Sequence, residues 1–478
     1  MRDINCTYVL TAADKAAVGN HAIRLDGERI VAVEPATSAC GPLFALPPLA
    51  NAHDHARATR SSSFGTAGKP LEIWLHMLAL LPAVDPYLAT AVSLARSALG
   101  GAGNVMVHYT RAQGLTDYVT EAKEVARAAR DVGVRIGFAP ALRDRNPLVY
   151  GPSDPILAAL KPQAREEITR RFIRAPMPVK EQIALVDAVA SACQSEICDV
   201  QYGPAAVHWC TPELLEGIAE ASARTGRRVH MHLLETRYQR DWADANFPDG
   251  IVRYLDSIRL LSPRLTLAHC AWARPDELAL IAERGATISV NTSSNLHLRS
   301  GIAPLAEMMR QGCRVALGLD GAALDEDDDA LREMRLADLL HGATGFQTKV
   351  TREQILTAVL VNGRRSVTNK DEGGTLRPGA PADILLLDWN TLDEDKLRPD
   401  LNPLDLLFAR SSARHIKELI VAGQTVVRDG RVRGIDHAAM NEDLLARFRH
   451  GIARNATLAA ALPDLERVVR DHFETPCC

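Results

Sequence analysis

The sequence predicts an α/β fold, a (β/α)8 TIM-like barrel with a small β-sandwich domain formed by both termini. Strand and helix patterns alternate eight times over about 270 residues, which is the size of such a barrel. The segments on either side are rich in strands and turns instead. Polar residues follow several of the strand patterns, and a closed barrel brings such strand ends together around one axis, whereas an open doubly wound sheet does not.

The small β-domain is expected to combine residues 1–48 with residues 374–436. Asp26-Gly27 is a typical hairpin turn between two of its strand patterns. Two separate terminal segments are the alternative to one shared domain. The strand patterns lie at residues 8–10, 21–25, 29–33, 382–388 and 416–433.

The barrel is expected to span residues 49–373. Thr211 followed by Pro212 predicts an N-cap and the first helical position of one of its helices. Residues 152–178 form a longer insertion after the third strand and are a candidate lid, and residues 437–478 are expected to form a C-terminal helical segment. Candidate strands end near His53, His108, Ala141, Gly203, Leu233, His269, Asn291 and Asp320. Helical patterns cover residues 117–131, 212–225, 275–284 and 302–311.

Composition limits the class of protein. The net charge of −4 and a pI near 6.4 give no basic surface for a nucleic acid. The nine cysteines follow no disulfide or zinc-knuckle spacing, and the N-terminus has no apolar signal region, so a reducing, cytoplasmic setting is expected. No stretch reaches the ~18 apolar residues of a membrane span.

Histidines and carboxylates mark the predicted strand ends. His53 and His55 are two residues apart, so both point to the same face of a strand, and the same holds for His230 and His232. Burying four imidazoles without a metal or hydrogen-bond partners is costly. Together with Asp320 they suit a divalent transition metal that keeps an open position for water, and therefore hydrolysis.

Two further residues fit proton transfer at such a centre. Glu235 falls just past the end of its strand, where it can take a proton from water and pass it to a leaving group. His269 ends another strand and can orient the water or polarise the electrophilic carbon. Asp320 can serve as both a ligand and a base.

Several motifs carry a resemblance to a known family. They are residues 46–55 (LPPLANAHDH), 229–236 (VHMHLLET), 268–270 (AHC), 294–304 (SNLHLRSGIAP), 317–321 (LGLDG), 333–337 (EMRLA) and 374–383 (GTLRPGAPAD). The chain resembles the metal-dependent amidohydrolase superfamily, and within it the branch that holds cytosine, guanine and S-adenosylhomocysteine deaminases and s-triazine hydrolases.

The resemblance implies site residues and a cofactor. His53, His55, His232 and Asp320 would be the metal ligands, Glu235 the proton shuttle, and His269 the contact to the attacking water. Binuclear members bridge two ions with a carboxylated lysine on the fourth strand, and residues 198–208 contain no lysine, so one divalent ion per subunit is expected. Zinc is the expected ion, with iron or manganese as alternatives.

The expected reaction is hydrolytic deamination of an amino-substituted N-heterocycle of the pyrimidine, purine or triazine type. An amide, urea or carbamate hydrolase that releases an amine on the same metal site is the alternative, and a barrel reused for binding alone is a third reading. Trp74, His208, Arg145 and Asn295 are candidate substrate contacts. Ala205 stands where better-known deaminases carry a histidine. A small-molecule substrate and a homodimer are expected.

Overall fold

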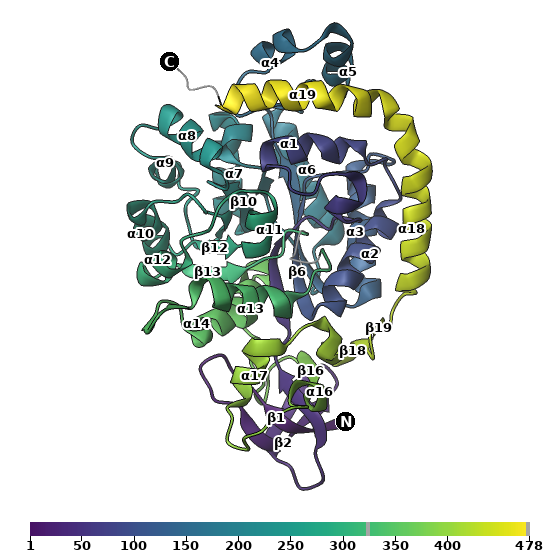
Figure 1. Ribbon diagram of the computed structural model, residues 1–478, viewed down its shortest axis with the longest axis vertical. Helices are drawn as coiled ribbons and strands as arrows, with labels where there is room; N and C mark the ends of the chain where they lie inside the picture. Colours follow the sequence, from purple (N-terminus) through teal and green to yellow (C-terminus); the bar gives the residue numbers. More distant parts are fainter. Residues whose placement is uncertain (322–325, 475–478) are drawn as a thin grey trace.

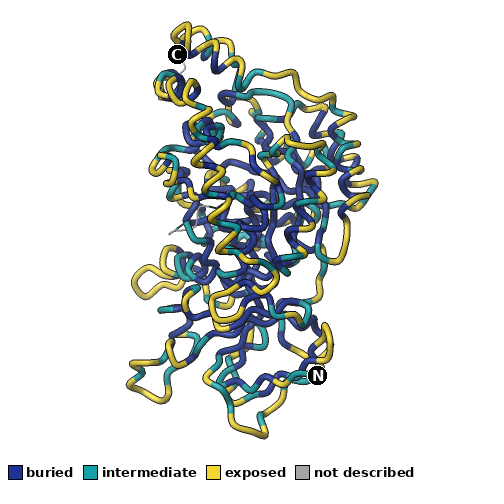
Figure 2. The backbone as a smooth tube through the Cα atoms, turned by 90° about the vertical axis from the view of Figure 1, so that its right-hand side faces the viewer, coloured by how far each residue is buried: buried dark blue, intermediate teal, exposed yellow. Residues whose placement is uncertain are grey.

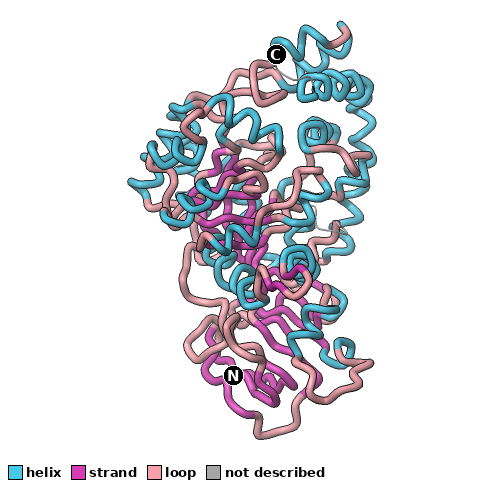
Figure 3. The backbone as a smooth tube through the Cα atoms, turned by 60° about the vertical axis from the view of Figure 1, so that its left-hand side comes forward, coloured by secondary structure: helices cyan, strands magenta, loops and turns pink. Residues whose placement is uncertain are grey.

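The computed structural model describes residues 1–321 and 326–474, and its largest part is a barrel of parallel strands surrounded by helices (Figures 1 and 3). Figure 2 shows that buried residues concentrate along the barrel, while exposed residues lie on the helices and loops around it. The fourth strand position is shared by two short strands, β8 and β9. The barrel strands are β5 (Leu49–Asp54), β6 (Ala102–Tyr109), β7 (Arg135–Leu142), β8 (Cys198–Val200), β9 (Gly203–Pro204), β10 (Val229–Leu233), β11 (Leu265–His269), β12 (Thr287–Val290) and β13 (Arg314–Leu317).

Hydrogen bonds close the barrel at the two points where its half-sheets meet. The half-sheets have the orders β5-β6-β7-β8 and β10-β11-β12-β13. Bridges between Tyr202 and Val229 and between Ala206 and His232 join them on one side. On the other side the Asp320 amide donates to the His53 carbonyl at 2.8 Å. The predicted TIM-like barrel is therefore confirmed, and the carboxyl ends of its strands face a common axis.

Helices connect the strands, and local sequence sets where they begin. The side chain of Thr211 accepts a hydrogen bond from the Leu214 amide and Pro212 is the first helical residue, as predicted. The helix expected at 302–311 is shorter, because Pro304 disfavours a helical conformation for the residue before it. The connecting helices are α1 (Leu71–Met77), α2 (Pro86–Leu99), α3 (Tyr118–Val132), α6 (Val179–Cys193), α7 (Pro212–Thr225), α8 (Arg237–Asn246), α9 (Ile251–Ser257), α10 (Pro275–Glu283), α11 (Thr292–His297), α12 (Leu305–Arg310), α13 (Ala330–His341), α14 (Arg352–Thr357) and α15 (Gly363–Thr368).

Both ends of the chain contribute to one further sheet, of order β19-β18-β17-β16-β4-β1-β2-β3. The edge of the sheet at β3 is hydrogen-bonded to the segment that precedes β16, so the sheet curls. The Ile30 amide donates to the Ala380 carbonyl, and the Ala382 amide donates to the Glu28 carbonyl. Shared strands from both termini were predicted, whereas the two layers of a sandwich stay a prediction. The strands are β1 (Arg2–Val9), β2 (Val18–Asp26), β3 (Arg29–Pro35), β4 (Gly41–Leu46), β16 (Ile384–Asp388), β17 (Ile416–Val421), β18 (Gln424–Arg428) and β19 (Arg431–Val432).

The insertion after the third strand packs against the last helix of the chain over the barrel (Figure 1). The insertion forms α4 (Asp154–Ala159) and α5 (Pro162–Phe172). After α16 (Trp389–Leu392) and α17 (Pro403–Arg410), the chain continues into α18 (His437–Ile452) and α19 (Ala456–Glu474). Apolar residues of α19 share a core with α1, α4 and α5. Within the described residues, no helix combines the length and apolar content needed to cross a membrane.

Candidate active site

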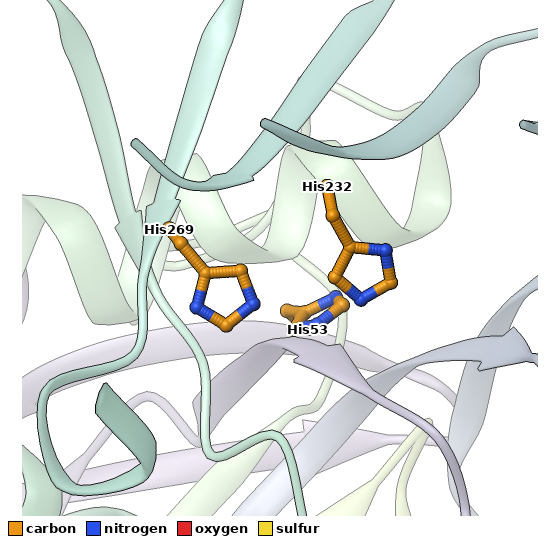
Figure 4. Close-up of side chains that lie close together, drawn as sticks. All are labelled: His53, His232 and His269. Atoms are coloured by element: carbon orange, nitrogen blue, oxygen red, sulfur yellow. The ribbon is translucent and has the colours of Figure 1, made fainter. Parts of the chain in front are cut away.

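The predicted site residues come together at the carboxyl ends of four barrel strands. His53 lies in β5 and His55 directly follows it, His232 lies in β10, and His269 is the last residue of β11. Asp320 follows β13. Figure 4 shows the imidazoles of His53, His232 and His269 turned toward one another. Groups of these histidines and Asp320 have candidate ligand atoms within 4.8 Å of one another.

The hydrogen bonds of two imidazoles determine which nitrogen carries the proton. His55 Nδ1 lies 2.7 Å from the carbonyl oxygen of His108, and His232 Nδ1 lies 2.7 Å from that of Ala205. Because a carbonyl oxygen only accepts, both Nδ1 atoms donate. In the neutral rings each Nε2 atom then carries a lone pair, and the Nε2 atoms of His55 and His232 face each other at a distance of 3.4 Å. Two facing lone pairs repel each other, and a cation placed between them would turn both into ligands.

His53 and Asp320 add two more electron-pair donors at the same point. His53 Nδ1 forms a hydrogen bond with His230 Nε2 at 2.7 Å. His53 Nε2 is buried without a hydrogen-bond partner in the described part of the chain. Asp320 Oδ1 lies 2.9 Å from His55 Nε2 and 3.5 Å from His53 Nε2. Three imidazoles and a carboxylate are a donor set that divalent transition metals accept. The residues present therefore fit a metal ion.

Electrostatics favour the ligating form of these groups. Burial lowers the pKa of His53 to about 3 and lowers that of His232 well below its ordinary value, so both rings are neutral at pH 7. Burial opposes ionisation of Asp320, but Arg57 and the adjacent imidazoles hold its pKa well below the usual range. Neutral imidazoles and an ionised carboxylate are the forms that bind metals.

Glu235 lies beside this cluster and faces His269. Its Oε2 is 3.7 Å from His269 Nε2, and Ser300 donates to its Oε1 at 3.4 Å. Burial, together with the negative charges of Asp320 and Glu72, raises the pKa of Glu235 well above its ordinary value. A buried carboxyl whose pKa is raised holds a proton more readily and can pass it to a reacting group.

His269 and Asp320 occupy unusual backbone conformations. Their φ angles are +74° and +56°, in the left-handed region that non-glycine residues seldom adopt. Leu234 and Cys270, next to the same strand ends, also have positive φ angles of 49° and 47°. Such conformations persist where the surroundings impose them, and they gather at functional sites.

Several supporting residues were not recognised in the sequence. Ser294 donates to Asp320 Oδ2 at 2.6 Å, and Asn51 joins β5 to the end of β13 by donating to Asp54 at 2.7 Å and accepting from the Leu319 amide at 2.8 Å. Arg57 donates to Asp320 Oδ1 at 3.3 Å. Asn51 and Asp54 are polar residues inside a wholly buried strand, and that pattern is the signal that would have found them.

The four predicted substrate contacts fall into two groups. Asn295 and Trp74 each contact a residue beside the candidate metal ligands, whereas Arg145 and His208 lie next to each other. Asn295 accepts from His269 Nδ1 at 2.8 Å, and its Nδ2 is buried without a hydrogen-bond partner in the described residues. The buried Trp74 contacts the guanidinium of Arg57, whose carbon lies 4.5 Å from the ring centre. Arg145 and His208 lie together, because Arg145 donates to the carbonyl of the residue before His208 at 2.9 Å.

A group of polar side chains connects the Glu235 loop to α1. The hydroxyls of Tyr150 and Thr236 both donate to Glu72 Oε1 at 2.7 Å. Gln239 accepts from the Glu235 amide at 2.9 Å and also reaches Tyr150. The ring centre of Tyr150 lies 4.4 Å from that of His208 and 5.3 Å from that of Phe473 in α19. The loop after β7, α19 and the Glu235 loop are thus in contact through Tyr150.

A barrel with buried imidazoles and carboxylates at the carboxyl ends of its strands defines the class of metal-dependent barrel hydrolases. The model of the amidohydrolase family matches residues 44–426. The chain belongs to this family, as the sequence motifs predicted.

The chain is similar to deaminases of known name. It is 31% identical over 266 residues to a 5'-deoxyadenosine deaminase of Methanosarcina barkeri, covering 55% of this chain and 60% of that protein. It is 27% identical over 464 residues to a 5-methylthioadenosine/S-adenosylhomocysteine deaminase of Moorella thermoacetica, covering 94% and 98%. The chain thus spans about three fifths of the first relative and nearly all of the second.

Solved structures share the fold. An adenosine deaminase from Xanthomonas campestris with bound zinc has a TM-score of 0.78 at 21% identity, covering 95% of this chain and 98% of that one. An atrazine chlorohydrolase mutant from Arthrobacter aurescens, complexed with zinc and atraton, has a TM-score of 0.79 at 21% identity, covering 94% and 100%. At this identity the likeness concerns the fold alone.

Proposed function

We propose that this protein catalyses the hydrolytic deamination of an amino-substituted N-heterocycle of the pyrimidine, purine or triazine type. The observation that carries the proposal is the convergence of four electron-pair donors beside a buried carboxyl of raised pKa. Relatives named as deaminases of adenosine derivatives support deamination over other hydrolyses.

His53, His55, His232 and Asp320 would hold one divalent ion, for which we propose zinc, with iron or manganese as alternatives. When bound there, the ion supplies a hydroxide nucleophile near neutral pH. Relatives in fold that contain zinc support this choice. The proposal of a single ion rests on the absence of a lysine in residues 198–208, where binuclear members of the family carry a carboxylated lysine.

Glu235 moves the protons in the proposed reaction. Its carboxylate takes one proton from the attacking water and passes it to the adjacent ring nitrogen. A second proton, from the hydroxyl formed on the attacked carbon, then moves through Glu235 to the leaving amino nitrogen, so that ammonia departs. His269 Nδ1 donates to Asn295, which leaves His269 Nε2 directed toward Glu235 and the water position. Asp320, already ionised, orients the water and can also accept its proton.

The remaining assignments complete the proposal. Trp74, His208, Arg145 and Asn295 are proposed substrate contacts. The protein is proposed to act as a cytoplasmic homodimer on a small molecule, without nucleic-acid or membrane partners. The proposed division is a β-sandwich from residues 1–48 and 374–436, a barrel from 49–373, and a helical segment from 437–478.

The test is ammonia release by zinc-loaded protein from aminopyrimidines, aminopurines and aminotriazines, with ureas, amides and carbamates as the comparison set. Glu235→Gln is the inactive control, and Glu283→Gln, an exposed carboxylate on α10, is the matched active one. The proposal is supported if a ring substrate releases ammonia with the unmodified protein and with Glu283→Gln but not with Glu235→Gln. Amine release from the acyclic compounds alone would overturn it in favour of an amide, urea or carbamate hydrolase.

A further inference from the structure

A cavity of about 50 Å³ lies on the flank of the proposed metal site. His55, one of the proposed ligands, and Arg111 both line it. A water-sized group needs roughly 10–15 Å³ on this measure, so the cavity has room for about three to five such groups. Much of the remaining wall is apolar, with Phe64, Leu78, Leu81, Ala89 and Phe448 among its residues.

Arg111 lies close to the proposed metal site in space. It comes two residues after the end of β6, and the intervening Thr110 has its hydroxyl 3.1 Å from His55 Nδ1. The carboxyl ends of the strands carry the chemistry of such barrels. Arg111 is therefore on the side of the barrel where a substrate enters.

The charge of Arg111 has no counter-charge within residues 1–321 and 326–474. Its Nη2 donates to the backbone carbonyls of Leu81 and Pro82, and no carboxylate pairs with it there. Arg171 of α5 adds a second cation, which donates to the carbonyl of Ala79 at 2.7 Å. Burial and then the charge of Arg171 lower the pKa of Arg111. Carbonyl dipoles do not neutralise two guanidinium charges, so the region attracts an anion.

Arg57 lines the same cavity, but unlike Arg111 it has a carboxylate partner. Its guanidinium is 3.3 Å from Asp320 Oδ1 and also donates to the Asp320 carbonyl, so its charge is already paired. Arg111 is thus the cation of this cavity that can serve a ligand. A guanidinium presents five donors in a planar fork that matches a carboxylate.

We propose that this cavity binds a carboxylate substituent of the heterocyclic substrate, with Arg111 as the specificity-determining residue. The inference rests on the proposed function and narrows its substrate class to amino-N-heterocycles that carry a carboxylate. The small volume favours a carboxylate over a phosphate with its ester linkage. The apolar wall accommodates the short link between ring and charge.

The test compares each parent ring of the panel with its carboxylate and with its uncharged carboxamide, which has nearly the same shape. A charge-assisted hydrogen bond predicts a preference of about 10- to 100-fold in kcat/KM for the carboxylate. In Arg111→Gln the ratio of the two kcat/KM values falls toward one. Arg111→Lys, which keeps the charge, retains part of the preference. Arg174→Gln, an exposed arginine just after α5, is the matched control and keeps the ratio.

Binding of the same pair to zinc-loaded Glu235→Gln protein, measured by calorimetry, gives a readout that does not need turnover. Tighter binding of the carboxylate that disappears on adding Arg111→Gln supports the inference. Equal binding of carboxylate and carboxamide, or an equal loss of both in the variant, would overturn it and leave Arg111 with the structural role of holding the carbonyls of Leu81 and Pro82. Turnover of the parent rings without any carboxylate preference leaves the deaminase proposal intact, whereas no turnover of any ring counts against that proposal alone.

Discussion

Removing one hydroxyl next to Asp320 tests the proposed metal centre without touching a ligand. In Ser294→Ala the 2.6 Å hydrogen bond to Asp320 Oδ2 is lost, and this carboxylate is 2% exposed, so bulk water does not replace the donor. A hydrogen bond to a charged group is worth about 1.5–3 kcal/mol, and removal of an outer partner of a ligand weakens metal binding by about 10- to 100-fold. We therefore expect the zinc Kd to rise by about 10- to 100-fold.

The assay is competition for zinc against a chromogenic chelator. Ser293→Ala is the matched control, because the neighbouring Ser293 hydroxyl is equally buried but makes no hydrogen bond to Asp320 in the described residues, so its loss should leave the zinc Kd unchanged. Thermal unfolding of the zinc-free proteins checks that both variants fold. A change in Kd below twofold in folded Ser294→Ala protein would refute the reasoning, since Asp320 would then not be held for a metal.

Three further predictions follow from the same geometry. Glu235→Gln should lower the rate of ammonia release by about 100-fold or more, because the proton carrier is removed. Metal analysis should show that zinc is still bound. Loss of zinc from the variant would contradict the role of Glu235 as a proton carrier. Burial raises the pKa of Glu333 to about 7, so its folded form binds a proton that the unfolded chain releases, and stability should fall as the pH rises from 4.5 to 7. Glu333→Gln should remove roughly 3 kcal/mol of that pH dependence in urea unfolding, and an unchanged slope would exclude Glu333 as its source. Gly318→Ala would place a methyl group 2.7 Å from the His53 amide nitrogen and against the Asn291 side chain. We expect the free energy of unfolding to fall by about 1–3 kcal/mol and the bound zinc content to decrease. An unchanged Tm would show that the strand end can shift to make room for the methyl group.

Local patterns account for the parts of the fold and site that could be predicted. Alternation of strand and helix predicted the barrel, and Thr211-Pro212 predicted the start of α7 at the observed residue. The periodic pattern at 302–311 predicts a helix that begins earlier than the observed start at Leu305, because Pro304 restricts the conformation of the residue before it. The spacing of His53 and His55 predicted a shared face, and both reach the same cluster.

The sequence by itself determined the class of chemistry, because the histidines and carboxylates at strand ends are readable from period-two alternation and from short motifs. Only the tertiary structure decided which atoms face the centre. The carbonyls of His108 and Ala205 direct the Nε2 atoms of His55 and His232 inward, and Ser294 orients Asp320. These contacts join residues 26 or more positions apart in the chain, and the pairing of barrel strands and the closure of the barrel bring them within hydrogen-bonding distance.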